Sequence, residues 1–177
     1  AKFGWLFWLA LGWIGLIVLA AALADLLPLP SPTDMDMLAR RAPPSPAHWL
    51  GTDRLGRDML ARLIHGGRIS LTVAILAPLI GLVIGGALGI VAGYFRGPFE
   101  TVVVGGVDVL LAFPPLVLAL AITAYLGQTV ANLTYIIGIL SIPAFTRVAR
   151  AATLSLASRE FILAARAMGA TELRILV

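Results

Sequence analysis

Two histidines and two aspartates are the side chains in this sequence best suited to binding a metal ion. His48 and His65 stand 17 residues apart in the one long polar stretch, and Asp53 and Asp58 lie between them. Imidazole nitrogens and carboxylate oxygens are common zinc ligands, so a metal site is conceivable. Solvated or interfacial side chains are the more common use of such residues in a polar stretch. We therefore predict no metal site.

Catalytic chemistry has few other candidates in the chain. Asp108 lies near the start of a predicted membrane span, where a proton or substrate role and a contact with water or an arginine are both open. The serines after residue 69 have no histidine base, because both histidines precede them. A phosphate-binding loop of the form GxxxxGK[ST] is also absent, since Lys2 is the only lysine. We predict no catalytic residue and no enzyme activity.

The composition is that of a membrane protein. Hydrophobic residues make up 60% of the 177 positions and charged residues only 12%, with a mean hydropathy of +0.99. A soluble domain carries about a quarter charged residues. The net charge of +4 does not indicate nucleic-acid binding, because the arginines are spread between apolar segments rather than gathered on one face. The absence of cysteine excludes disulfides and thiolate metal sites.

Four segments are predicted to cross a bilayer. They are residues 3–24, a part of residues 69–95, residues 101–126 and residues 130–145. The first has no charge and would be about 33 Å long as a helix, which is enough for a hydrocarbon core of about 30 Å. Pro114 and Pro115 are expected to kink the third span, and the fourth helix can run on past Arg147 and Arg150. We therefore predict an all-α fold, a polytopic transmembrane helical bundle that forms a single domain.

Glycines recur at every fourth position of the second span. They are Gly81, Gly85, Gly89 and Gly93. Small residues at this spacing lie on one helix face and let a neighbouring helix approach closely. A single such pair arises by chance in apolar helices, but four in register favour a helix-packing face.

The polar stretch, residues 25–68, is predicted to lie outside the membrane. Its first part is rich in proline and is expected to be extended or turned. Its second part has apolar residues at helical spacing, namely Leu55, Met59, Leu60, Leu63 and Ile64. Charged residues occupy the other side of this pattern, which is typical of an amphipathic helix at the membrane interface.

Residues 158–177 are predicted to form two short helices hinged at a glycine. Residues 160–168 read as the first helix, Gly169 and Ala170 as a break, and Thr171 as the N-cap of the second. Alanines on one side would let a partner approach the backbone, and Phe161, Ile162 and Leu163 would be apolar anchors. We expect a docking element, and a push on it would move the adjoining transmembrane helix as a lever.

Orientation in the membrane does not follow from charge. An even number of spans places both ends on one side, and lysine and arginine then count seven on that side and six on the other. The chain begins without methionine and stops within a helical pattern, so we expect a fragment of a longer protein.

Several stretches resemble one family of transport proteins. Residues 163–169, LAARAMG, are similar to the EAA loop, pattern EAAxxxG, of the permeases of bacterial ABC importers, with Leu163 in the place of the glutamate. WLGTDRLGRDMLARLIHGGRISL, VDVLLAFPPLVLAL and REFILAARAMGA resemble the second permease of the dipeptide, oligopeptide and nickel importer group. The resemblance covers nearly the whole chain.

This resemblance implies a type I ABC importer permease in the inner membrane, with six spans and cytoplasmic termini, of which about four spans are present. Residues 25–68 would be extracytoplasmic, near a substrate-binding protein. Residues 158–177 would be the cytoplasmic coupling loop that docks on an ATP-binding subunit, through Glu160, Leu163, Ala164, Ala165, Arg166, Gly169 and Ala170. A homologous second permease would complete the pair. ATP and magnesium would be bound by the ATPase subunits, so no cofactor is expected on this chain.

The function implied is ATP-driven import of di- or oligopeptides. Asp108, Pro114 and Pro115 would be part of the path or of a hinge. Two alternatives stay open at this point. The solute could be nickel or another small molecule of the same group, since no residue here selects a substrate, or the chain could be a membrane anchor that transports nothing.

Overall fold

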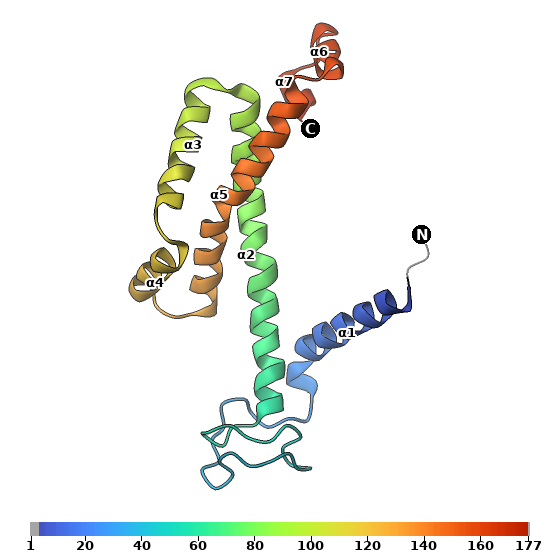
Figure 1. The fold of residues 1–177 in the computed structure, drawn as a ribbon, viewed down its shortest axis with the longest axis vertical. Coiled ribbons are helices and arrows are strands. Elements are labelled where there is room, and N and C mark those ends of the chain that lie inside the picture. Colours follow the sequence, from blue (N-terminus) through green and yellow to red (C-terminus); the bar gives the residue numbers. More distant parts are fainter. Residues whose placement is uncertain (1–3, 177) are drawn as a thin grey trace. The chain divides into compact units, whose positions relative to one another are not determined.

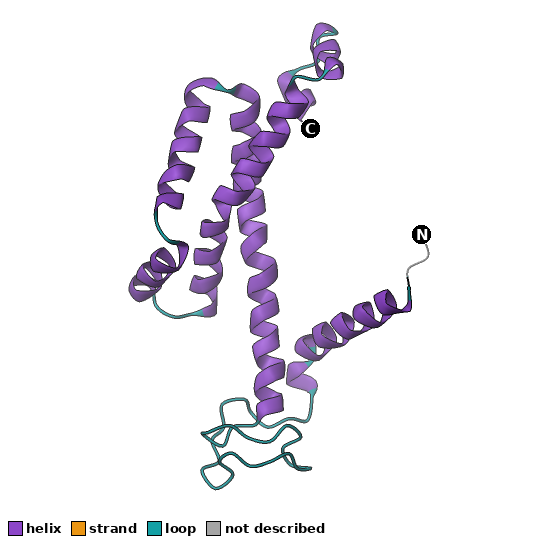
Figure 2. Ribbon diagram, in the orientation of Figure 1, coloured by secondary structure: helices purple, strands orange, loops and turns teal. Residues whose placement is uncertain are grey.

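The computed structural model describes residues 4–176, and within that range every regular element is a helix (Figures 1 and 2). The elements are α1 (Trp5–Ala22), the 3-10 turn η1 (Ala24–Leu26), α2 (Met59–Phe95), α3 (Gly97–Ala112), α4 (Pro115–Leu126), α5 (Val130–Ala157), α6 (Glu160–Ala167) and α7 (Glu172–Leu176). The chain divides into two units, Ala1–Thr72 and Val73–Val177. Lys2, Phe3 and Val177 lie outside the described residues. The prediction of an all-α chain is confirmed.

Membrane-crossing capacity agrees with the sequence pattern. Among residues 4–176, α1, α2 and α5 are each long and apolar enough to cross a membrane, and α3 with α4 makes a fourth span if the bent pair is counted as one. In the first unit, α1 ends at Ala22 and the chain continues through η1 into a proline-rich loop without helix up to Asp58.

The helix α2 differs from the sequence prediction. Residues 59–65 are its first turns and not a separate interfacial helix, and Leu55 lies in the preceding turn. The helix passes through Gly66 and Gly67 without interruption and reaches 37 residues, roughly 55 Å at helical rise. Continuing keeps each backbone N–H and C=O paired, whereas a break next to the membrane would leave several of these groups unsatisfied.

Proline breaks the third predicted span more sharply than the kink expected from sequence. The axes of α3 and α4 differ by 86°. Phe113 and Pro114 both have extended backbone, with ψ of 137° and 123°, because each precedes a proline ring that disfavours helical geometry. Pro115 then starts α4, where its missing N–H has no helical partner to lose. In Figure 1, α3 runs beside α5 and α4 turns across the end from which α5 starts.

The helix α5 is the centre of the second unit. Thr129 caps its first turn by accepting a hydrogen bond from the Asn132 backbone at 3.1 Å. The helix runs to Ala157, so the prediction that the fourth span continues past Arg147 and Arg150 is confirmed. Five of its residues are buried, namely Thr134, Ile136, Gly138, Pro143 and Thr146.

The glycine stripe of α2 lies directly against α5. A Cβ atom added at Gly81 would be 2.7 Å from the Cβ of Ser141, and one added at Gly85 would be 2.5 Å from the carbonyl oxygen of Ile142. At Gly93 it would be 2.9 Å from the carbonyl oxygen of Arg150. The two backbones therefore approach so closely that no side chain fits between them.

Candidate functional site

The last two helices, α6 and α7, form what we call the terminal helix pair. Gly169 has a φ of +86° and ends α6 in the left-handed conformation that glycine adopts without strain. The backbone N–H groups of Gly169 and Ala170 donate to the carbonyls of Arg166 and Ala165, both at 3.0 Å. After Thr171 the chain turns into α7. The helix, glycine, helix arrangement expected from sequence is present, with α6 ending one residue earlier, at Ala167.

The terminal helix pair presents an apolar surface that the described part of the chain does not cover. Phe161, Leu163 and Met168 are 60%, 53% and 82% exposed. Glu160 and Ala164 are exposed too, whereas Ala165 and Ala170 are half-buried. Large apolar side chains beside small ones, outside a membrane-spanning segment, form a surface suited to a protein partner.

Arg166 faces the body of the second unit. Its Nη2 donates to the hydroxyl of Tyr94 at 3.0 Å, and its guanidinium carbon is 5.7 Å from the centroid of the Tyr94 ring. The same nitrogen is 3.4 Å from Oε2 of Glu172, which also accepts a hydrogen bond from the Tyr94 hydroxyl. The hydrogen bond with Tyr94 and the charge of Glu172 raise the pKa of Arg166. Arg166, Tyr94 and Glu172 form the Tyr94 cluster.

Sequence reasoning missed Tyr94. The residue directly follows the glycine stripe, and an aromatic ring with a polar tip at the end of an apolar helix is typical of a membrane interface. Its position could therefore be noticed from sequence. Its partners lie 72 and 78 residues further along the chain, and helical periodicity contains no information on such pairing.

Asp108 is paired with an arginine. Its Oδ1 accepts from Nη2 of Arg147 at 2.7 Å, and both side chains are more than half exposed. A second ion pair, which sequence reasoning did not identify, joins Glu100 to Arg150, whose Nε donates at 2.8 Å. Of the two possibilities left open for Asp108, the structure supplies the arginine contact. Both pairs connect α3 to α5, and the break at Pro114 and Pro115 comes directly after α3.

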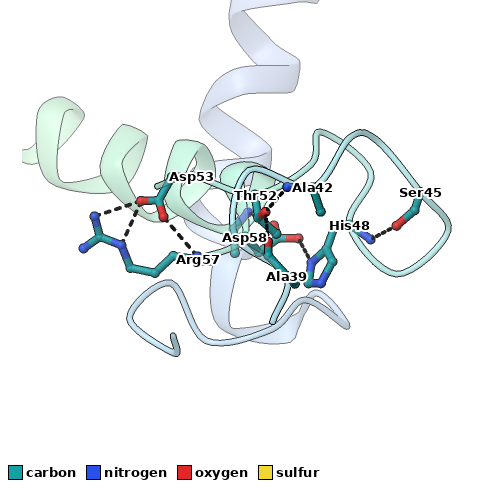
Figure 3. A network of polar contacts seen from close by, with 9 residues as sticks. Ala39, Ala42, Ser45, His48, Thr52, Asp53, Arg57 and Asp58 are labelled. Carbon is teal, nitrogen blue, oxygen red and sulfur yellow. Dashed lines mark hydrogen bonds and ion pairs between the residues drawn. The ribbon is translucent and has the colours of Figure 1, made fainter. Parts of the chain in front are cut away.

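The loop before α2 is held by buried and half-buried polar side chains, which we call the polar loop cluster (Figure 3). Asp53 accepts hydrogen bonds from the backbone N–H groups of Leu55 at 2.8 Å and Arg57 at 3.0 Å. It also accepts from Nε of Arg57 at 2.9 Å and pairs with Arg62. One carboxylate therefore fixes the turn and connects it to α2.

The other half of the cluster is built on Thr52 and Asp58. The Thr52 hydroxyl accepts from the backbone N–H of Ala42 at 2.8 Å and donates to the carbonyl of Ala39. Asp58 caps α2 by accepting from the backbone N–H of Ala61 at 2.7 Å, and its other oxygen lies 3.0 Å from Nδ1 of His48. The GTDRLGRD sequence, residues 51–58, is thus explained by local structure.

The histidines are paired with carboxylates and do not converge. His48 contacts Asp58, while Nε2 of His65 lies 3.7 Å from Oδ1 of Asp25, which also pairs with Arg68. Between residues 4 and 176 no three His, Cys, Asp or Glu side chains are grouped as a metal ion would require.

Hydrogen bonds set the ionisation of the cluster. Burial acts to raise the pKa of Asp53, but the backbone N–H groups of Arg57 and Leu55 and the Arg57 guanidinium outweigh it and hold that pKa below its ordinary value. The same balance applies to Asp58, where burial is outweighed by the Ala61 N–H and by His48, so that its pKa is lowered. Both carboxylates therefore stabilise the loop when they are ionised.

We expect the loop to lose its structure in acid. A carboxylate whose pKa is lowered on folding contributes stability above its unfolded pKa, about 4, and loses it as the pH falls through the lowered value. The Asp53→Asn variant has no such charge, so its loop should open even at pH 5. The measurement is the rate of pepsin cleavage within residues 25–58 in both proteins. The ratio of the variant rate to the wild-type rate should fall toward one as the pH is lowered from about 5 to about 2. A ratio independent of pH would contradict this expectation.

Comparison with known proteins places the chain among transport components. The family model described as "Binding-protein-dependent transport system inner membrane component" matches residues 85–177. The glutathione transport system permease protein GsiD of Pectobacterium atrosepticum is 46% identical over 133 residues, which are 75% of this chain and 44% of that protein. The dipeptide transport system permease protein DppC of Alkalihalophilus pseudofirmus is 38% identical over 168 residues, 92% of this chain and 55% of that protein.

A third relative agrees with these two. The dipeptide transport system permease protein DppC of Haemophilus influenzae is 33% identical over 167 residues, which are 91% of this chain and 57% of that protein. The chain spans about half the length of the curated relatives that it matches.

Proposed function

The chain belongs to the family of binding-protein-dependent transport system inner membrane components, and from that membership we propose that it is a permease subunit of an ATP-driven importer of di- or oligopeptides. It is a multi-pass protein of the inner membrane with the type I permease fold of ABC importers. The proposal concerns the substrate, the partners and the part that each element plays.

The terminal helix pair provides the main support for this proposal. Its exposed Phe161, Leu163 and Met168, beside small alanines, form the docking surface for a cytoplasmic ATP-binding subunit. That subunit binds ATP and magnesium, in keeping with the absence of a phosphate-binding loop from this sequence. Because α6 follows α5 after only two residues, closure of two ATPase subunits would displace a membrane helix and shift the permease between its inward-open and outward-open states.

The remaining parts fit the same scheme. The polar loop cluster lies on the extracytoplasmic side, where a substrate-binding protein delivers the solute, and a homologous second permease covers the exposed apolar faces of the membrane helices. The break at Pro114 and Pro115 serves as a hinge beside Asp108.

Peptides are supported as substrates by the names of the relatives, two of which transport dipeptides and one glutathione. Glutathione is the second candidate, because the relative named for it is the most identical of these three. Uptake of a labelled dipeptide, in competition with unlabelled glutathione, separates the two. Strong inhibition by glutathione would favour the second candidate.

A single cysteine at Ala165 of the full-length protein tests the docking proposal. Residues 1–177 contain no native cysteine, so within this range a thiol crosslinker reacts at that site alone. We expect a crosslink to an ATP-binding subunit, with a yield that changes when ATP is added. Failure to crosslink, together with labelling of Ala165→Cys by an impermeant reagent from outside, would invert the proposed topology.

The matched control is a cysteine at Leu38, whose side chain is 99% exposed in the loop before α2. It should be labelled from outside intact cells and should give no crosslink to the ATP-binding subunit.

A further inference from the structure

We propose that Tyr94 of α2 is a positioning residue that fixes the orientation of the terminal helix pair, so that this pair moves two membrane helices and not α5 alone. This inference rests on the proposed function and adds a second mechanical connection to it. The contact is made by the Tyr94 cluster, which joins α2 to both members of the pair.

The covalent connection to α5 is not sufficient to transmit a rotation. Only Ser158 and Arg159 separate α5 from α6, and Arg159 is extended, with φ of −72° and ψ of 146°. A two-residue link passes a push along the chain but leaves the attached helix free to swing about it, because its backbone dihedrals are soft. Directional transmission requires a second point of attachment.

Packing does not supply this second point. An open groove of about 430 Å³ lies between the terminal helix pair and the helices α2 and α5. Its walls include Ile90, Tyr94, Leu156, Phe161, Ile162 and Ile175. Well-packed interiors hold side chains in place by contact on every side, and along this open groove the terminal helix pair lacks such contact.

The hydroxyl of Tyr94 supplies the attachment instead. It donates to Glu172 of α7 and accepts from Arg166 of α6 at 3.0 Å, so one atom contacts both helices on either side of Gly169. The exposed fractions of Arg166 and Glu172 are 48% and 51%, and a direct ion pair at such exposure contributes little by itself. The shared hydroxyl therefore sets both the angle at the glycine and the position of the pair against α2.

The glycine stripe extends this connection. Tyr94 directly follows Gly93, whose backbone lies against Arg150 of α5. A displacement of the terminal helix pair thus reaches α2 through Tyr94 and α5 through Ser158. These two helices pack against each other without intervening side chains. The two helices should then move together when the ATP-binding subunits close.

The test uses the whole transporter, with the full-length permease, its partner permease, the ATP-binding subunits and the binding protein in proteoliposomes. Peptide uptake and ATP hydrolysis are measured on the same vesicles. Tyr94→Phe keeps the ring over the guanidinium and removes both hydrogen bonds. We expect uptake per ATP hydrolysed to fall about fivefold, at the low end of measured coupling between sites, while the ATP-binding subunits stay bound.

Tyr125→Phe is the matched control. Tyr125 of α4 is 90% exposed, and its hydroxyl makes no hydrogen bond within residues 4–176. Uptake per ATP should be unchanged in this variant. An unchanged ratio in Tyr94→Phe as well, or loss of the ATP-binding subunits from that variant, would overturn the positioning role. Absence of ATP-driven uptake by the wild type would instead refute the proposed function.

An exchange of charges provides a second measurement, in which Tyr94 itself is left unchanged. Arg166→Glu and Glu172→Arg should each lower uptake per ATP, because like charges then flank the hydroxyl. The double exchange restores opposite charges, and the Tyr94 hydroxyl can again donate to one and accept from the other. We expect the double variant to recover at least half of the wild-type ratio, and a double variant no better than either single one would overturn the geometry.

Discussion

Replacing Gly56 with alanine is expected to unfold the polar loop cluster, with a loss of at least about 3 kcal/mol of local stability. Gly56 has a φ of +76°, a conformation that costs an alanine roughly 1–2 kcal/mol. In addition, the new Cβ would overlap the carbonyl oxygen of Asp36 and lie 2.5 Å from its carbon. These are backbone atoms, so no side-chain rotation relieves the overlap.

Gly97→Ala separates the two contributions, because Gly97 has a φ of +71° and no atom within 4 Å of an added Cβ. It should lose only the conformational part, roughly 1–2 kcal/mol. Hydrogen exchange in the purified full-length protein measures both losses of local stability. The amides of residues 51–58 report the loss in Gly56→Ala, and those of residues 97–101 report the loss in Gly97→Ala. Equal losses in the two variants would show that the overlap at Gly56 is absent.

The second large effect is expected at Gly89, in the middle of the glycine stripe. An added Cβ would lie 2.8 Å from the Cβ of Ala149 and 2.9 Å from the backbone nitrogen of Arg150, and still closer to the carbonyl oxygen of Thr146. Gly89→Ala should force α2 and α5 apart along the whole stripe. We expect a cost of about 3 kcal/mol, the upper end for overpacking, because two of the three obstructing atoms belong to the backbone.

Gly86→Ala is the matched control in the same helix. Its Cβ would meet only Cδ1 of Leu82, at 4.0 Å. Thermal unfolding of the purified full-length protein should show a clear decrease in midpoint for Gly89→Ala and none for Gly86→Ala. Similar midpoints for the two variants would argue against the close approach of α2 and α5.

The sequence predicted those parts of the fold that depend on local pattern. Long, predominantly apolar runs located the membrane helices, and the break at Gly169 was predictable because glycine ends helices in a conformation that other residues avoid. The fourfold spacing of the glycines indicated a packing face on α2. The sequence did not predict which helix packs against this face. Gly138 of α5 also allows a close approach, since a Cβ added there would lie 2.9 Å from the Cβ of Ile80, but it is not part of a regular glycine spacing.

Where the sequence prediction and the structure differ, long-range or cooperative effects are responsible. Gly66 and Gly67 have weak helix propensity, but the cost of unpaired backbone groups beside a membrane keeps α2 continuous. Adjacent prolines indicate a bend at Pro114 but not its angle of 86°. Tyr94 belongs to the candidate site only because α6 and α7 return to α2, and that return depends on tertiary structure.

The alignment of Gly81, Gly93 and Tyr94 along α2 has a consequence for how this gene can change over time. Each residue added to a helix rotates everything beyond it by about 100°. A codon inserted between Gly89 and Gly93 would leave the first glycines against α5 while turning Tyr94 away from Arg166. Exchanges among apolar residues are compatible with this geometry. Insertions are compatible only near whole turns, such as seven residues, which restore the direction to within about 20°. Reading-frame-preserving changes in length should therefore be rarer here than substitutions.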